Sequence, residues 1–499
     1  MEYIIGLDIG TTSTKAIAFD VAGKLLVENQ VGYPILTPQP DFCEQDPDVI
    51  FNAVLQGIRF ITQKLNSKEY ELLGVSFSSA MHSLIAMDKE GKALTHSITW
   101  ADTRSKNIAE ALRGTPLGHE IYMKTGTPIH PMSPLCKLAW LKKHQPDVFA
   151  GSERFISIKE YVLYRLFGQY VVDYSIASAT GLFDIHRLDW CPQALEVAGV
   201  TAKQLSALVP PTHQLKGLPD AHAVVMGVDA QVPFIVGASD GCLANVGANA
   251  ILPGNAAVTI GTSGAIRVMA QEPLSDSGER LFSYVLNSKH FILGGAVNSG
   301  GIILRWFRDN FASQEMQQAM EQNADPYELL LKKAADIPAG AEGLVFLPYL
   351  LGERAPYWNA DARGMFFGVD IRHTRNHFTR AVMEGIIYGL CSVGKALEET
   401  AGPINVIYAN GGFARSEQWV QMLADIFNKK VRVSESHETT ALGAAVVGLE
   451  SLGILQSVEE VANFVPTIKE YIPDPEKQAV YQQRFATFER LYQKLKDEF

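Results

Sequence analysis

The start of the chain alternates between short apolar runs and polar turns. Residues 3–9 form a β-branched apolar run, which meets a Gly-Thr-Thr-Ser-Thr turn and continues as a second apolar run. Another turn at Ala22-Gly23 leads into a third segment. Because tight polar turns join these runs, the pattern predicts an antiparallel β-meander.

An amphipathic helix and a buried strand are predicted after the meander. Asp46 suits the N-cap position and Pro47 the first helical position, and apolar residues then recur at helical spacing as far as Leu65. The run LLGVSFSS (72–79) follows as a buried strand with a polar end. Strands alternating with amphipathic helices indicate an α/β architecture, in which ligands bind beyond the carboxyl ends of the strands.

The same strand-turn-strand pattern returns past the middle of the chain. A second apolar run, AAVTI (256–260), meets Gly261-Thr262-Ser263 and continues as a further strand, as residues 3–9 meet the first turn. Two unrelated hairpins would give the same pattern, but each copy opens one half of the chain. We therefore expect two α/β domains, residues 1–245 and residues 246–499.

The second half ends in helical patterns. A long helix is predicted from about residue 376 to 399, and residues 404–428 indicate a strand, a Gly-Gly turn and a helix opened by that turn. A last helix follows Asp474-Pro475 and carries aromatic residues at helical spacing. We expect this aromatic stripe to be core packing rather than a binding face.

Charge and cysteine content exclude several classes of protein. The 499 residues include 43 Lys and Arg against 54 Asp and Glu, a formal net charge of −11, which argues against a nucleic-acid partner. The five cysteines form no CxxC pair, and no leader-like segment precedes the first strand, so we expect neither a disulfide framework nor a signal peptide.

The uncharged run 242–266 contains Asn, Pro and Gly and predicts buried strands and turns rather than a membrane helix. We expect a cytoplasmic protein without a membrane partner, and the sequence leaves open whether it forms a homodimer.

Two turns and a Gly-Gly pair could together bind a nucleotide. The first turn offers small residues whose backbone N–H groups can point at a phosphate, but it lacks the P-loop spacing. The second turn could clamp the same phosphates from the other domain, and bare backbone at the Gly-Gly pair could approach a nucleoside. The candidate residues for binding ATP are Gly10, Thr11, Thr12, Ser13, Lys15, Gly261, Thr262, Gly411 and Gly412.

Two aspartates are candidates for the chemistry of phosphoryl transfer. Asp8 ends the first strand, where it either caps the turn or holds Mg²⁺ through water. Asp240 lies in GASDG at the domain junction; Asp-Gly is often a purely structural turn, but phosphoryl transfer needs a carboxylate to orient the acceptor hydroxyl. We expect Asp240 to be the catalytic base.

Three polar clusters could recognise a polyol: Met81-His82-Ser83, residues 100–104 beginning with Trp100, and Gly352-Glu353-Arg354. Tryptophan can supply an apolar platform, and planar donors and acceptors can bind hydroxyl groups. Each cluster could equally consist of satisfied surface or core groups. His82 follows the polar end of a strand, where a ligand-binding role is easier to explain.

These motifs resemble the FGGY family of carbohydrate kinases from residue 3 to about residue 455. GLDIGTTSTK (6–15), GASDG (237–241) and IGTSG (260–264) are similar to the family's first phosphate element, base element and second phosphate element. Residues 132–144 and 364–384 are similar to two longer family fingerprints. The resemblance implies an ATP- and Mg²⁺-dependent sugar kinase with two actin-like (ribonuclease H-like) domains and a ligand cleft between them that closes over its ligands.

The resemblance also implies roles for individual residues. Asp240 matches the family's catalytic aspartate and Asp8 its metal-side aspartate. Met81 and His82 fall where xylulose kinases contact their sugar. The residues that match nucleotide-binding positions are Thr11, Thr12 and Ser13 in the first turn, Thr262 in the second, Gly301, and Gly412 with Ser416 in the adenosine loop.

Within the family, the segments AMHS (80–83), 125–132 and 172–184 are most similar to gluconate kinases. The resemblance therefore implies phosphorylation of D-gluconate at its terminal hydroxyl, giving 6-phosphogluconate. Because gluconate is an anion and the protein is acidic, a local cation should bind the substrate carboxylate. Arg267, Lys159 and Arg354 are the candidates, each of which could instead form a structural ion pair. Arg267 is preferred because it follows the second phosphate turn.

Two alternatives remain open at this point. A xylulose kinase would share Met81-His82, although xylulose kinases typically have Gln before this pair and Gly after it, where this chain has Ala80 and Ser83. A protein of another class, an actin-like or chaperone-like nucleotide-dependent switch, would use the same two turns without a sugar. Such a switch would hydrolyse ATP whether or not an acceptor is present.

Overall fold

The computed structural model describes residues 1–65, 68–434 and 438–499. The chain forms two compact units. Unit 1 comprises Met1–Ile251, Ala270–Ile292 and Glu438–Val465; unit 2 comprises Leu252–Met269, Leu293–His437 and Pro466–Phe499. Two segments from the second half of the sequence therefore belong to unit 1.

Unit 1 is built on a six-stranded mixed sheet. Across the sheet its strands are β13 (Gln214–Leu215), β14 (Phe234–Ser239), β5 (Glu71–Ser79), β1 (Glu2–Ile9), β2 (Ser13–Asp20) and β3 (Leu25–Gly32). Strands β1, β2 and β3 are antiparallel neighbours, which confirms the predicted meander. Strands β5 and β14 run parallel to β1, so the carboxyl ends of these three strands lie at one edge.

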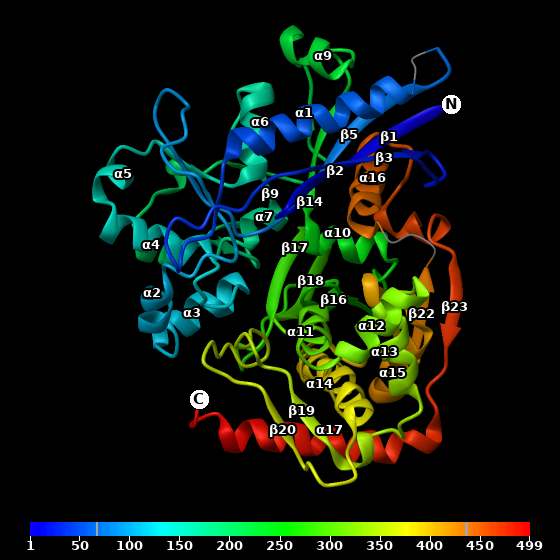
Figure 1. Ribbon diagram of the computed structural model, residues 1–499. Helices are drawn as coiled ribbons and strands as arrows, with labels where there is room; N and C mark the ends of the chain where they lie inside the picture. The colour runs from blue at the N-terminus through cyan, green and yellow to red at the C-terminus, as the bar shows by residue number, and fades with distance from the viewer. Residues whose placement is uncertain (66–67, 435–437) are drawn as a thin grey trace. The chain divides into compact units, whose positions relative to one another are not determined.

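Helices cover both faces of this sheet because side chains alternate along β1. Ile5 and Leu7 belong to the apolar core that also contains the buried face of α1 (Pro47–Lys64). Ile4 and Gly6 face the other way, toward α16 (Thr439–Ser451): a Cβ added at Gly6 would lie 2.1 Å from the Ala441 carbonyl oxygen. Figure 1 shows α16, in orange, beside the blue strand β1.

Helix α1 begins as the sequence predicts. The side chain of Asp46 accepts hydrogen bonds from the backbone N–H groups of Asp48 and Val49, and Pro47 occupies the first turn. Ile50, Val54 and neighbouring apolar residues are buried against the sheet. Each such side chain contributes about 1.5–3 kcal/mol through burial.

The second sheet repeats the strand order of the first. Its strands are β17 (Phe282–Asn287), β18 (His290–Val297), β16 (Gly264–Ala270), β15 (Asn255–Ile260), β21 (Val406–Asn410), β22 (Lys430–Ser434) and β23 (Thr467–Tyr471). The order β18-β16-β15-β21-β22-β23 corresponds to β3-β2-β1-β5-β14-β13: in each, an antiparallel hairpin is followed by two parallel strands and an antiparallel sixth strand. The expected α/β fold, with one architecture used twice, is confirmed.

Further elements surround the two sheets. The other helices of the first half are α2 (Lys106–Leu112), α3 (Pro116–Thr125), α4 (Pro134–His144), α5 (Pro146–Ala150), α6 (Ile158–Phe167), α7 (Tyr174–Ser178), α8 (Pro192–Ala198), α9 (Asp220–Met226) and α10 (Asp240–Gly247). The second half adds α11 (Gly301–Phe311), α12 (Ser313–Gln322), α13 (Pro326–Ala335), α14 (Arg375–Ala401), α15 (Glu417–Phe427) and α17 (Pro475–Leu495). The short paired strands are β4 (Glu44–Gln45) with β7 (Ser97–Ile98), β6 (Ile85–Met87) with β8 (Arg154–Ile156), β9 (Val171–Asp173) with β12 (Ala207–Val209), β10 (Phe183–Asp184) with β11 (Asp189–Trp190), and β19 (Val345–Leu347) with β20 (Met365–Phe367).

Two predictions about the later sequence have different outcomes. The aromatic stripe of α17 is core packing as expected, because Tyr481, Phe488 and Tyr492 are buried against β19. The prediction of strands and turns for residues 242–266 is wrong at its start, where α10 is helical. Gly247 allows this helix to pack closely on α16, since a Cβ at that position would lie only 1.8 Å from the Thr439 carbonyl oxygen.

None of the helices within the described ranges is both long and apolar enough to cross a membrane. All five cysteines are free thiols, and four of them are buried.

Candidate active site

The carboxyl edge of the first sheet brings the two candidate aspartates toward each other. Asp8 on β1 is in register with Ser78 on β5, and Ser78 is in register with Ala238 on β14. Two interstrand spacings separate Asp8 from Ala238, about 10 Å between Cα atoms. Asp240 follows Ala238 by two residues, where β14 passes into α10.

Asp8 is a partly buried carboxylate with defined partners. The Ser78 hydroxyl donates a hydrogen bond of 2.7 Å to its Oδ1 atom. Burial raises the pKa of Asp8 above its usual value, while the Ser78 hydrogen bond and the charge of Lys15 lower it. Lys15 in turn forms an ion pair with Glu438, its Nζ atom lying 2.8 Å from both carboxylate oxygens.

The first phosphate turn is held in place through its carbonyl groups and one hydroxyl. The Tyr33 hydroxyl donates to the Gly10 carbonyl at 2.7 Å, and the Tyr33 N–H donates to the Thr12 carbonyl at 3.0 Å. Gln45 Nε2 donates to the Thr11 carbonyl at 2.5 Å, and the Trp100 indole N–H donates to the Thr11 hydroxyl at 2.9 Å. With its acceptors engaged in this way, the turn suits an anion that approaches its N–H groups.

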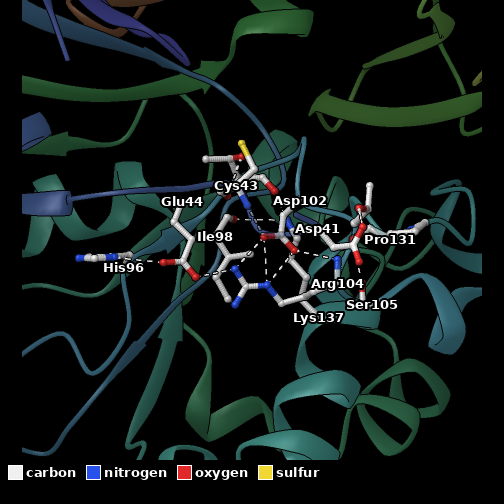
Figure 2. A network of polar contacts seen from close by, with 12 residues as sticks. Asp41, Cys43, Glu44, His96, Ile98, Asp102, Arg104, Ser105, Pro131 and Lys137 are labelled. Atoms are coloured by element: carbon white, nitrogen blue, oxygen red, sulfur yellow. Dashed lines mark hydrogen bonds and ion pairs between the residues drawn. The ribbon is translucent and has the colours of Figure 1, made fainter. Parts of the chain in front are cut away.

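A network of charged residues joins the two segments that carry Gln45 and Trp100. Figure 2 shows Glu44, Asp102 and Arg104 within this network. The Arg104 guanidinium lies 2.7 Å from Asp102 and 2.5 Å from Glu44, and it stacks 3.6 Å from the centre of the Phe42 ring. Asp102, which is fully buried, also accepts a hydrogen bond of 2.7 Å from the Cys43 N–H. These contacts join residues 41–45 to residues 98–104.

Lys137 on α4 is a buried residue that contacts the segments carrying His82 and Trp100. Its Nζ atom is fully buried and donates to the carbonyls of His82 at 2.6 Å and of Thr99 at 2.7 Å. Burial lowers the pKa of Lys137 to about 7, and the Asp102 carboxylate opposes that shift. One ammonium group therefore connects the segments that carry His82 and Trp100.

His82 has a defined tautomer. Its Nδ1 atom lies 2.7 Å from the Ala179 carbonyl oxygen, so Nδ1 must carry the proton, and Nε2 of the neutral ring then accepts from the Tyr284 hydroxyl at 3.3 Å. The backbone of His82 has a φ of 66°, in the left-handed region. Met81, before it, is half-buried just beyond the carboxyl end of β5.

Asp240 is the first residue of α10 and is half-buried. Its Oδ1 atom accepts a hydrogen bond of 2.7 Å from the Gly241 N–H. The preceding residue, Ser239, caps the helix by accepting from the Cys242 N–H. The N-terminal end of a helix stabilises a negative charge, so this position suits an ionised carboxylate.

In unit 2, the second phosphate turn lies against the start of α11. The N–H of Gly301 donates to the Gly261 carbonyl at 2.7 Å, and the Ile302 N–H donates to the Thr262 carbonyl at 3.1 Å. A Cβ at Gly301 would lie 2.7 Å from the Gly261 carbonyl oxygen, so only glycine permits this approach. Thr262 itself is exposed.

The Gly411-Gly412 pair follows β21 and lies next to the second phosphate turn. Gly411 has a φ of 93°, and a Cβ there would lie 2.7 Å from the Ile260 carbonyl oxygen, next to the second turn. Gly412 is exposed with open space beside its Cα atom. The prediction that this pair opens an α-helix is wrong: a 3-10 turn, Gly412–Arg415, intervenes because Ser416 caps α15 by accepting from the Trp419 N–H at 3.3 Å.

The three candidate cations for a substrate carboxylate have different surroundings. Lys159 is fully buried and paired with Asp173 at 2.5 Å, which makes it a structural cation. Arg354 donates to Asn298 Oδ1 at 2.9 Å and to the Val297 carbonyl at 3.2 Å. Arg267 lies on β16, three residues beyond the start of that strand, and is half-buried.

Sequence reasoning missed Gln45, Lys137 and the Arg104 network as supports of the site. They act mainly on backbone atoms that are distant in sequence, so no spacing indicates them. One available signal was Lys137 itself, a charged residue among the apolar positions of α4 that the structure buries.

Comparison with known proteins identifies the family of the chain. The N-terminal domain of the FGGY family of carbohydrate kinases matches residues 3–247, and its C-terminal domain matches residues 256–451. The chain belongs to the FGGY family of carbohydrate kinases. The expected family is thus confirmed, and with it the assignment as a phosphotransferase that uses ATP.

Individual family members match over nearly the whole chain. The gluconokinase of Bacillus subtilis (strain 168) is 45% identical, over 100% of this chain and 97% of its own length. Two solved structures from Lactobacillus acidophilus, a gluconate kinase and a ligand-bound xylulose kinase, each have a TM-score of 0.94 and 36% identity, covering 99% of this chain and 98% of theirs.

Proposed function

We propose that the protein transfers the γ-phosphate of ATP to the terminal hydroxyl of D-gluconate, giving 6-phosphogluconate. The structural observation that carries this proposal is the pair of aspartates at one sheet edge, Asp8 and Asp240, with Asp240 at a helix N-terminus. The substrate is proposed from the 45% identity to a gluconokinase along the full chain.

Asp240 is the proposed base. Its carboxylate would accept a hydrogen bond from the terminal hydroxyl of gluconate, orient that oxygen toward the γ-phosphate, and take its proton as the P–O bond forms. Because phosphoryl transfer passes through a loose transition state, the position of the hydroxyl matters more than a strongly basic carboxylate. The bond to the Gly241 N–H fixes Oδ1, so the side chain enters the reaction already oriented.

Asp8 is the proposed residue for Mg²⁺, and its donor set fits this ion. Mg²⁺ is commonly held by one or two carboxylates, waters and substrate phosphates rather than by a cage of protein ligands. Mg²⁺, when bound, neutralises charge on the β- and γ-phosphates.

The nucleotide would be bound by backbone groups. The turn at Gly10–Ser13 in the proposed N-terminal domain (1–245) would border the phosphates, with the N–H groups of Thr11 and Thr12 as the proposed donors because the Gly10 N–H already donates to the Ser13 carbonyl. Gly261, Thr262 and Gly301 would border the phosphates in the proposed C-terminal domain (246–499). Gly411 and Gly412, with Ser416, would border the adenosine. Lys15 would contribute positive charge while it remains paired with Glu438.

Gluconate would be recognised by Met81, His82 and Trp100, with Arg267 as the proposed partner of its carboxylate. Arg267 is preferred because it lies on β16, shortly after the second phosphate turn. A charge-assisted hydrogen bond from an arginine would select an aldonic acid over an uncharged polyol.

The decisive experiment measures ADP release from MgATP with no acceptor, D-gluconate, D-xylulose, L-ribulose or glycerol. Stimulation mainly by gluconate supports the proposal. Preference for xylulose would favour the second candidate function, a xylulose kinase. The xylulose kinase structure from Lactobacillus acidophilus supports this second candidate, because it matches the chain with the same TM-score and identity as the gluconate kinase structure. ADP release that no acceptor changes would instead indicate a nucleotide-dependent switch.

The cytoplasmic location and the formation of a homodimer remain predictions.

A further inference from the structure

A buried ion pair lies behind the proposed base, within unit 1. Lys159, near the start of α6, and Asp173, at the end of β9, are both fully shielded from solvent, and their Nζ and Oδ2 atoms are 2.5 Å apart. Burying two charges costs several kcal/mol of desolvation free energy for each ion, which close pairing must offset. The Asp173 carboxylate also accepts hydrogen bonds from other groups.

The other oxygen of Asp173 organises the start of α7. Asp173 Oδ1 accepts hydrogen bonds from the backbone N–H groups of Ser175 and Ile176, and from the Ser175 hydroxyl at 2.5 Å. The hydroxyl proton of Ser175 is therefore directed to Asp173. Its oxygen is left to accept a hydrogen bond from another group.

That other group is the main chain next to the proposed base. The Ser239 N–H donates to Ser175 Oγ at 2.6 Å, and Ser239 immediately precedes Asp240. Ser239 also caps α10 through its own hydroxyl. Ser239 is therefore held at its backbone N–H by Ser175 and at its side chain by the helix that begins with Asp240.

We propose that Ser175 is a positioning residue for Asp240, and that the Lys159–Asp173 pair orients the Ser175 hydroxyl for this task. The proposal rests on the proposed function, because it requires Asp240 to be the base. Ser175 touches neither substrate nor nucleotide in this arrangement; it acts through the Ser239 peptide. A displacement of about 1 Å in a reacting group can cost about 100-fold in rate.

The test is the Ser175→Ala variant of the full chain, assayed with MgATP and gluconate. We expect kcat to fall about 10- to 100-fold, with the KM values for ATP and gluconate within about two-fold of the wild type. Ser175→Thr keeps the hydroxyl and should restore most of kcat. Ser178→Ala is the matched control: Ser178 is on the same helix, equally buried, and its hydroxyl accepts from the Val285 N–H instead.

A double variant distinguishes positioning from a general structural effect. If Ser175 acts through the Asp240 carboxylate, adding Ser175→Ala to Asp240→Asn should lower kcat by less than two-fold more, because the two losses are not independent. Full additivity, or equal kcat losses in Ser175→Ala and Ser178→Ala, would overturn the inference. If Ser175→Ala does not fold, Ser175→Cys takes its place, because a thiol is a poor hydrogen-bond acceptor that still fills the space of the hydroxyl.

The outcomes separate this inference from the proposed function. An Asp240→Asn variant with near-wild-type turnover would refute the base and the positioning role together. An inactive Asp240→Asn beside a fully active Ser175→Ala would refute only the role of Ser175.

Discussion

The indole N–H of Trp100 donates its hydrogen bond to the hydroxyl of Thr11, in the first phosphate turn. A tryptophan expected to form a platform for the sugar therefore also contacts the proposed nucleotide side of the site. The Arg104 network, which orders residues 98–104, connects both functions to one buried cluster of charges.

Trp100→Phe should raise the KM for ATP about five-fold and change the KM for gluconate little. The substitution keeps an aromatic face but removes a hydrogen bond worth about 1 kcal/mol. Steady-state kinetics with each substrate varied in turn measures both constants. A rise confined to the gluconate KM would show that the indole N–H serves the sugar instead.

Asp240→Asn should lower kcat by about 100- to 10,000-fold, the range ascribed to general base catalysis, while ADP binding by calorimetry stays unchanged. Asp220→Asn is the matched control, because Asp220 is also the first residue of a helix, α9, but is exposed. Comparable losses in both variants would mean that the amide disturbs helix starts in general rather than catalysis.

The KM for ATP should rise as the pH falls through about 7. Burial raises the pKa of Glu353 from 4.5 to about 7. When ionised, Glu353 accepts from the N–H of Asn298 and the hydroxyl of Ser299, just before the nucleotide-side residue Gly301. Protonation replaces one of these acceptor sites by an O–H donor and should therefore displace residues 298–301 from the position they hold beside the ionised carboxylate.

The sign of the accompanying stability change follows from the same shift. Between pH 4.5 and 7 the folded protein holds a proton on Glu353 that the unfolded chain has released, so its contribution to the unfolding free energy falls as the pH rises through this window. Glu353→Gln cannot titrate and should flatten both profiles. An unchanged pH dependence in that variant would assign the effect to another group.

Arg267→Gln should lower kcat/KM for gluconate about 10- to 100-fold, because a hydrogen bond to a charged group is worth about 1.5–3 kcal/mol. Any turnover measured with xylulose, which has no carboxylate, should stay unchanged. Arg267→Lys should recover part of the loss. Arg305→Gln is the matched control for the loss of one positive charge, because Arg305 is an exposed residue of α11. Equal losses with gluconate and xylulose would make Arg267 a structural residue of β16.

Local features of the fold were predictable because their causes lie within a few residues. Asp46 and Pro47 start α1, and the Gly-Thr turns join antiparallel strands, wherever these segments pack. The α10 helix was missed because it contains two Gly residues together with Asp, Asn and Val, all of which have a weak intrinsic helix preference. Its packing on α16, about 200 residues later, decides the outcome.

The positions of Asp8, His82 and Asp240 at or just beyond the ends of strands were predictable, because each follows a buried apolar run. Their supports were not, because Gln45, Lys137 and Ser175 bind backbone groups contributed by distant segments. Every residue has a backbone carbonyl and nearly every residue a backbone N–H, so a hydrogen bond to the main chain requires no particular residue type at the partner position. Such bonds can therefore be identified only in the folded structure.

The close approach of Gly6 to Ala441 has a consequence for how the protein is made. One face of the first sheet is covered by α16, which the ribosome synthesises roughly 10–40 s after residue 251 at about 5–20 residues per second. The first unit to emerge is thus incomplete until nearly the whole polypeptide has been translated. During that interval the apolar face of β1 and β5 is open to aggregation, and a nascent-chain chaperone would protect this surface.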